Sequence, residues 1–188
     1  MDLLREETVL GLNMAFLLGP SANLVYDLRC MEKVGRTPEW AAYRGGKFWL
    51  NSEGGAGAAS LFPDTQSLRE HHITPQYPRW PAGLNEGIYR GNNAGSAGVC
   101  LADVLGAETI YLLGFDMRAD AVGRANWHDL YPEKWRASES QLATYRNDLD
   151  RVSKMVRAKV VNLTPGSALR CFPAATLEDA LSAGRARA

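Results

Sequence analysis

The sequence contains little cysteine and no excess of either charge. Its three cysteines, Cys30, Cys100 and Cys171, are far apart and belong to no CxxC motif or Cys/His cluster, which argues against a disulfide framework and a zinc site. Lysine plus arginine and aspartate plus glutamate each number 21, so the net charge provides no attraction to nucleic acid or to an anionic membrane. We therefore expect reduced, mostly buried thiols and no nucleic-acid partner.

Long apolar segments are also missing. The longest candidate, residues 104–115, is broken by Gly106, Glu108 and Gly114, and a membrane-spanning helix needs roughly 20 consecutive apolar residues. The first residues also lack the basic-then-apolar order of a secretory signal peptide. These absences predict a cytoplasmic protein without a membrane span.

The composition, 46% hydrophobic over 188 residues, suits a single globular domain, 1–188, with a sizeable core. Strand-like and helix-like segments alternate along it, which is typical of an α/β fold with a mostly parallel sheet and helices on both faces. The expected strands are Thr8–Asn13, Leu24–Tyr26, Lys47–Leu50, Gly87–Tyr89, Thr109–Leu113 and Val160–Leu163. We expect the first and the fifth of these to be central strands, because both are apolar.

Two other segments have a clear character. Residues 51–86 are rich in glycine, proline and polar residues, which predicts an irregular surface excursion. In contrast, apolar residues recur at steps of three and four from Leu142 to Val156, which predicts a long amphipathic helix. Ser138 and Gln141 have the spacing of a capping box at its start.

A glycine-rich loop, "GNNAGSAG" (Gly91–Gly98), opens an apolar helix predicted from about Gly95 to Leu105 and ended by Gly106. Glycines allow the backbone to approach a ligand closely, and helix starts offer unpaired amide groups to anions. Asn92 and Asn93 add amide donors and acceptors, and Ser96 has the side chain of a helix cap. A tight turn requires the same residue types, so the loop alone leaves a turn and a ligand cradle both open.

The next predicted strand ends in "LLGFDM", which places Gly114 and Asp116 at the carboxyl edge of the sheet, where ligands bind in open parallel sheets. Asp116 could accept from a sugar hydroxyl or orient a base, and it could equally cap a turn. About ten residues later, "ANWHDLYPEKW" gathers Trp127, His128 and Tyr131. Histidine suits proton transfer near neutral pH, so His128 is either a general base or a surface histidine. For His71 and His72 we expect solvent exposure.

Several blocks resemble a known family when they are taken in chain order: "GLNMAFLL", "NNAG", "IYLLGFDM", "WHDLYPEKW" and "VVNLTPGSALRCFP". They are similar to the bacterial sialyltransferase family that includes the lipooligosaccharide enzymes. The resemblance is closer still to its phage and bacterial relatives of the motility accessory factor and pterin pyrophosphokinase-like group. It implies a Rossmann-like fold and transfer of a nonulosonic (sialic acid type) sugar from a CMP-linked donor to a glycan acceptor, without a metal or other cofactor. For a phage-encoded member the location would be the host cytoplasm.

The resemblance also implies roles for individual residues. Asn13 resembles the family asparagine that touches the nucleotide, and Asn93, Ala94 and Gly95 resemble the family segment that meets the donor. His128 matches the histidine that acts as the base, with Asp116 as the alternative. The nucleotide-binding candidates further include Asp27, Asn92, Ser96, Gly114, Trp127 and Tyr131.

Two departures from the family pattern leave other functions open. The chain starts at what matches the family's second strand, so we expect it to lack the usual first strand and its phosphate loop, and Ala94 stands where a serine is usual. A non-catalytic phage-borne structural or assembly protein would need only the fold. A nucleotide-dependent pyrophosphokinase would need carboxylates for magnesium. Association of identical chains is a further possibility that the sequence does not decide.

Overall fold

The computed structural model describes residues 4, 6–26, 30, 32–33, 35–51, 64–71, 73, 79–124, 128, 130–131 and 136–185. The chain forms two compact units, Met1–Gly106 (unit 1) and Ala107–Ala188 (unit 2). Each unit has its own parallel strands and helices, which makes the fold α/β and Rossmann-like. The α/β class was predicted from the alternating pattern, and the Rossmann-like character was implied by the family resemblance. A single domain over 1–188 stays a prediction.

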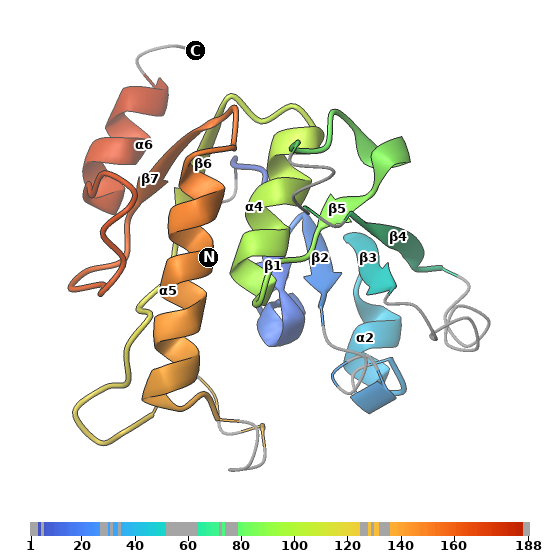
Figure 1. Ribbon diagram of the computed structural model, residues 1–188. Coiled ribbons are helices and arrows are strands. Elements are labelled where there is room, and N and C mark those ends of the chain that lie inside the picture. The colour runs from blue at the N-terminus through green and yellow to red at the C-terminus, as the bar shows by residue number, and fades with distance from the viewer. Residues whose placement is uncertain are drawn as a thin grey trace. The chain divides into compact units, whose positions relative to one another are not determined.

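Unit 1 contains a five-stranded sheet in which all neighbouring strands are parallel and follow one another in chain order (Figure 1). Four of its strands were expected within a few residues. The strands are β1 (Leu10–Leu12), β2 (Ala22–Val25), β3 (Gly46–Asn51), β4 (Gln66–His71) and β5 (Ile88–Tyr89). Because β1 stands at one end of this order, the expectation that it is a central strand is not met within this sheet.

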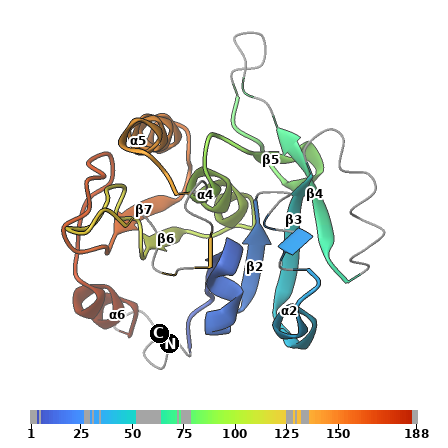
Figure 2. The same ribbon diagram turned by 90° about the horizontal axis from the view of Figure 1, so that it is seen from below.

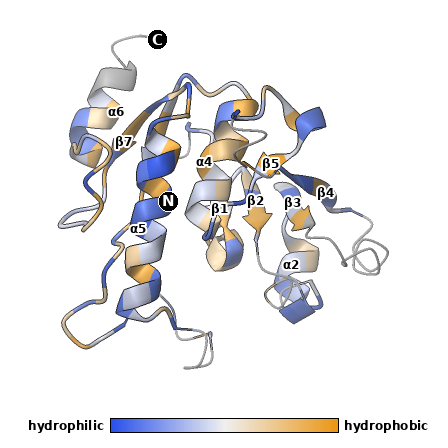
Figure 3. Cartoon of the chain, in the orientation of Figure 1, coloured by the Kyte–Doolittle hydropathy of each residue, from blue (hydrophilic) through white to orange (hydrophobic). Residues whose placement is uncertain are grey.

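The strand that the sequence did not reveal is β4, which lies inside the segment 51–86 expected to be irregular. That expectation is wrong for residues 66–71, since β4 pairs with both β3 and β5. Leu68 is its only buried hydrophobic residue, and Figure 3 draws β4 in the blue of hydrophilic residues beside the more apolar β2 and β5. With one apolar side chain in six residues, β4 lacks the pattern by which a strand is recognised.

Helices cover both faces of the sheet in unit 1. On one face, α4 (Ala94–Val104) packs so closely that a Cβ on Gly98 would lie 2.7 Å from Cδ2 of Leu12. Adjacent strand residues point to opposite faces, and the Lys47 ammonium lies 5.4 Å from the Trp40 ring centroid of α2 (Pro38–Ala42). The strand register aligns Leu12 with the neighbour of Lys47, so the side chains of Leu12 and Lys47 point to opposite faces of the sheet. The helices α4 and α2 therefore cover opposite faces, as predicted.

The sheet curves around α4. This helix contacts β1 and β2 as well as β5, although β1 and β5 are the two end strands of the order, and Figure 2 shows α4 nearly end-on beside β2 and β5. Most of its residues are buried, including Gly95, Ser96 and Gly98. The short 3-10 helix η2 (Asn13–Leu18) follows β1 directly and packs against β1 and β2.

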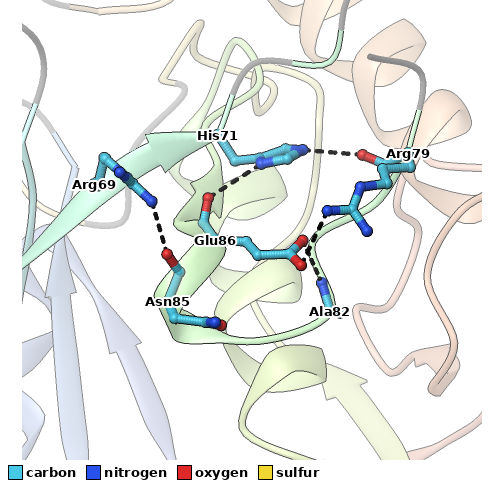
Figure 4. A network of polar contacts seen from close by, with 6 residues as sticks. All are labelled: Arg69, His71, Arg79, Ala82, Asn85 and Glu86. Atoms are coloured by element: carbon cyan, nitrogen blue, oxygen red, sulfur yellow. Dashed lines mark hydrogen bonds and ion pairs between the residues drawn. The ribbon is translucent and has the colours of Figure 1, made fainter.

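A polar network ties the chain before β5 to β4 (Figure 4). Both ring nitrogens of His71 face backbone carbonyls, Nδ1 at 3.1 Å from Glu86 O and Nε2 at 3.0 Å from Arg79 O. The Ala82 amide donates to the Glu86 carboxylate, and this bond, together with Arg79, holds the pKa of Glu86 below its ordinary value. His71 is therefore half-buried and engaged, contrary to the expectation of solvent exposure, while His72 lies outside the described residues.

The network positions η3 (Leu84–Glu86), after which Gly87 enters β5. Gly87 has φ +92°, and a Cβ there would lie 2.6 Å from the backbone oxygen of Arg69. A side chain would clash with backbone that has no freedom to move, so this close approach requires glycine.

Unit 2 has a two-stranded parallel sheet of β6 (Thr109–Leu112) and β7 (Lys159–Asn162), both expected from the sequence. Its helices are α5 (Glu139–Ser153) and α6 (Leu177–Arg185). The capping box of Ser138 and Gln141 is present, with both reciprocal bonds, as predicted.

The cysteines and the hydrophobicity of the helices agree with expectation. Cys30, Cys100 and Cys171 carry free thiols, the first two of them buried. Within the part of the chain that the structure describes, no helix has the length and apolar character needed to cross a bilayer.

Candidate functional site

In unit 1, predicted site residues and two further polar residues follow the carboxyl ends of parallel strands. Asn13 comes directly after β1, Tyr26 after β2, and the segment Arg90–Asn93 after β5. Because these strands are parallel and belong to one sheet, their carboxyl ends meet at one edge, which is where open α/β sheets bind ligands. We call residues 90–93 the β5 exit.

Asn13 adopts a left-handed backbone conformation, with φ 52°, which asparagine tolerates better than most residues. Its Oδ1 accepts from the Tyr26 amide at 3.0 Å, and its backbone oxygen accepts from Asn23 Nδ2, also at 3.0 Å. Its own Nδ2 makes no hydrogen bond to another described residue. The acceptor of Asn13 therefore serves the fold, whereas its donor remains for a ligand.

Tyr26 connects Asn13 to the β5 exit. Its hydroxyl donates to the backbone oxygen of Gly91 at 3.1 Å, and the Arg90 guanidinium stacks over its ring at 5.1 Å from the centroid. Asn13 and the glycine-rich loop, which are almost 80 residues apart in the sequence, are thus joined through one side chain. Asn13 and the glycine-rich loop therefore lie at one edge of the sheet in unit 1.

Asn93, rather than Ser96, is the N-cap of α4. Asn93 Oδ1 accepts from the Ser96 amide at 2.9 Å, and Asn93 Nδ2 donates to Ser96 Oγ at 3.0 Å. Asn93 is 7% exposed and Ser96 is fully buried, so both side chains belong to the scaffold. Asn92 is exposed beside them.

The cap leaves two amides that bond to none of the described residues. An α-helix begins with N–H groups that have no intrahelical acceptor; here the Ser96 amide bonds to the Asn93 side chain and the Ala97 amide to the Asn93 carbonyl. The amides of Ala94 and Gly95 make no hydrogen bond to another described residue. Two adjacent donors at a helix start, one of them on a glycine, form an arrangement that suits an anion.

In unit 2, the β6 exit (Leu113–Arg118) carries Gly114, with φ +75°, and Asp116. The Phe115 amide donates to Thr164 Oγ1 at 2.9 Å, and the Ala168 amide donates to the Asp116 carbonyl at 2.8 Å. Arg146 Nη1 donates to the carbonyl of Met117 at 2.7 Å. Every one of these bonds uses backbone atoms of the β6 exit.

The Asp116 side chain is consequently exposed, and its carboxylate makes no hydrogen bond or ion pair to another described residue. The next residue, Met117, has φ 51°, a left-handed conformation that is strained for methionine. Asp116 therefore caps no turn among the described residues, and its role as a base stays a prediction.

His128 contacts Tyr131 edge to face, with ring centroids 4.6 Å apart, so the neighbouring aromatic ring expected from the sequence is present. The Leu130 amide donates to Nδ1 of His128 at 3.3 Å. Nδ1 is then the acceptor, which places the proton of the neutral ring on Nε2. To take up a proton at Nδ1, His128 must first release the Leu130 amide.

Several predicted residues cannot be located in this arrangement. Asp27 and Trp127 lie outside the described residues. Gly114, Asp116, His128 and Tyr131 belong to unit 2 and Asn13, Asn93 and Gly95 to unit 1, so their convergence on one ligand stays a prediction.

Sequence reasoning missed two residues of the unit 1 edge, Tyr26 and Arg90. Tyr26 is the last residue of the predicted strand Leu24–Tyr26, and Arg90 directly follows the predicted strand Gly87–Tyr89. Their position at strand ends was the available signal, but the prediction relied on the glycine and asparagine motif instead. Among the described residues no group of three or more His, Cys, Asp or Glu side chains could hold a metal ion.

Comparison with known proteins adds no family: no family model, curated protein or solved structure matches the chain significantly. The arguments about function therefore depend on the residues themselves and on the motifs described above.

Proposed function

We propose that the chain is a glycosyltransferase that binds the nucleotide of a CMP-activated sugar at the carboxyl edge of unit 1 and transfers the sugar, of nonulosonic acid type, to an acceptor hydroxyl. The observation that carries the proposal is the start of α4, where the amides of Ala94 and Gly95 make no hydrogen bond within the part of the chain that the structure describes. Asn13 Nδ2, at the same edge, adds a donor. Donors without a negative counterpart suit phosphate and ribose oxygens.

The proposed roles follow from which atoms are already engaged. Asn93 holds the helix start in place rather than contacting the donor, because both its side-chain polar atoms are bonded to Ser96. His128 removes the acceptor proton, as the family resemblance implies. Asp116 is the alternative base, supported by its exposed and unpaired carboxylate.

Nucleotide binding is tested by thermal unfolding with CMP, CDP, UDP and ATP, the last with and without magnesium. CMP at 100 times its dissociation constant should stabilise the fold by roughly 2.7 kcal/mol. Gly95→Val should abolish this shift, because a β-branched side chain blocks close approach to the amide. Ala102→Val, in the last turn of the same helix, controls for the lower helix propensity of valine and should retain it.

Transfer is tested with a CMP-linked sialic acid and a panel of glycan acceptors. His128→Ala should reduce turnover by about 10² to 10⁴-fold, the usual contribution of a positioned base, with CMP affinity within a few-fold. If His128→Ala left turnover unchanged and Asp116→Ala instead reduced it by about 10² to 10⁴-fold, Asp116 would be the base. A chain that neither binds CMP nor transfers sugar would be the non-catalytic protein, and a response to magnesium–ATP alone would indicate a pyrophosphokinase.

A further inference from the structure

Arg90 is the one cation of the β5 exit, and it is held in a defined direction. Its Nε lies 3.3 Å from Oε1 of Glu70, a β4 side chain that is only 7% exposed, while the Arg90 side chain is 42% exposed. The central carbon of its guanidinium lies over the Tyr26 ring, 5.1 Å from the ring centroid. A buried carboxylate and an aromatic ring therefore both contact the guanidinium and restrict its position.

The 3.3 Å contact between Arg90 Nε and Glu70 Oε1 is an ion pair and not a hydrogen bond. The other donors of Arg90 are its two terminal amino groups. Neither makes a hydrogen bond to another described residue. A guanidinium offers five N–H donors in a rigid fork, and its paired terminal N–H groups match two oxygens of a phosphate or carboxylate. Glu70 offsets part of the charge but engages only the Nε side, so the fork keeps its hydrogen-bonding capacity.

The position of Arg90 indicates which part of a nucleotide it would meet. It directly precedes Gly91, whose carbonyl accepts from Tyr26, and it lies three residues before the N-cap of α4. An anionic group held by the amides of Ala94 and Gly95 would have oxygens left for a second set of donors on the same edge. A nucleoside alone has no such group.

We propose that Arg90 recognises the phosphate of the bound nucleotide, and that Glu70 and Tyr26 are positioning residues that aim its guanidinium. This inference rests on the proposed nucleotide site and adds its specificity: the site selects phosphorylated nucleosides over nucleosides. Arginine suits this role better than lysine, because a single ammonium cannot replace the two-pronged contact.

The test compares CMP with cytidine by calorimetric titration of the full chain. The wild type should bind CMP at least tenfold more tightly than cytidine. Arg90→Gln should remove that preference by weakening CMP binding at least tenfold while leaving cytidine affinity within twofold. Arg90→Lys should weaken CMP binding less than Arg90→Gln does, but it should not bind CMP as tightly as the wild type. Arg69→Gln is the matched control, since Arg69 is an exposed arginine of unit 1 that donates to the Asn85 carbonyl, and it should bind both ligands as the wild type does.

Because Arg90→Gln leaves the Glu70 carboxylate buried without its cation, the double variant Arg90→Gln/Glu70→Gln removes both charges and should show the same loss of preference in a folded chain. Glu70→Gln alone keeps Arg90 and should lose part of the preference. Equal wild-type affinities for CMP and cytidine would overturn the role of Arg90 while leaving nucleotide binding intact. Binding of neither ligand would overturn the proposed function, and an Arg90→Gln variant that still prefers CMP would overturn this inference alone.

Discussion

The strand exits of the two units are built in opposite ways. In unit 1, Asn13 and Asn93 use their side chains to hold the fold, one as an acceptor for Tyr26 and the other as the cap of α4. In unit 2, the backbone of the β6 exit makes the structural bonds, and the Asp116 side chain is left exposed. The side chain of an asparagine in a glycine-rich loop can thus stabilise the fold, while the backbone amides of the loop are the groups that can bind a ligand. An exposed aspartate on a loop held by its backbone can instead use its own carboxylate.

The comparison predicts that Asn13 matters most for stability. Asn13→Ala removes the acceptor of a partly buried amide and leaves alanine in a left-handed conformation, so the free energy of unfolding should fall by about 2 kcal/mol. Denaturant unfolding measures the change. Asn85→Ala, an exposed asparagine of the same unit, should change it by less than about 0.5 kcal/mol. Equal effects of the two substitutions would show that Asn13 is not part of the scaffold.

Loss of the α4 cap should have a smaller effect. Asn93→Ala should lower the free energy of unfolding by about 1 kcal/mol, the usual cost of losing an N-cap side chain. Asn93→Asp retains the accepting oxygen and places a negative charge at a helix start, so it should restore most of the stability. Because that charge would also repel an anion at the amides of Ala94 and Gly95, Asn93→Asp should weaken CMP binding. An Asn93→Asp variant with wild-type CMP affinity would contradict an anion site at this helix start.

Asp116 should contribute least to stability among these residues. Asp116→Asn keeps the backbone bonds of the β6 exit, so the free energy of unfolding should stay within about 0.5 kcal/mol of the wild type. Removal of the Thr164 hydroxyl in Thr164→Val, which takes away the acceptor of the Phe115 amide, should cost about 1 kcal/mol instead. If Asp116→Asn proved the more destabilising of the two, the Asp116 side chain would be structural and the contrast between the exits would not hold.

The last prediction concerns the half-buried thiol of unit 2. Burial raises the pKa of Cys171 to about 11 from an ordinary 9.0, so at pH 8 its thiolate fraction, and hence its alkylation rate, should be about 100-fold below that of an unperturbed thiol. The rate, followed by mass spectrometry of the labelled peptide, should rise about tenfold per pH unit towards pH 11. Because the folded-state pKa is the higher one, the thiol's contribution to stability is complete below pH 9 and is lost as the pH rises to 11. Rapid labelling at pH 8 would contradict the burial of this side chain.

The sequence predicted the fold well wherever apolar residues carried the pattern. Six strands, α4 and the capping box of α5 were expected close to their observed positions, because burial of apolar faces determines these elements. β4 was missed for the converse reason: only Leu68 is buried, and β4 is held by its neighbours on both sides. Contacts between distant residues decide such a strand, and no local pattern records them.

For the candidate site, sequence reasoning predicted positions better than roles. It placed Asn13 and Asn93 at strand ends correctly, but their residue types could not reveal which atoms the fold would engage. Ser96 was expected to cap α4, although Asn93 does so. Tyr26 and Arg90 acquire their significance only when β2 and β5 are brought to one edge, which is a property of the folded sheet rather than of either segment.

The chain-order arrangement of β1 to β5 has a consequence for synthesis on the ribosome. Each strand that emerges finds its parallel partner already made, so the sheet can grow one strand at a time from the N-terminal side. Its completion nevertheless waits for α4, the element that contacts both end strands and fills one face. Until residue 104 has left the exit tunnel, that apolar face has no cover from α4, and exposed apolar surface of this kind promotes aggregation of a nascent chain.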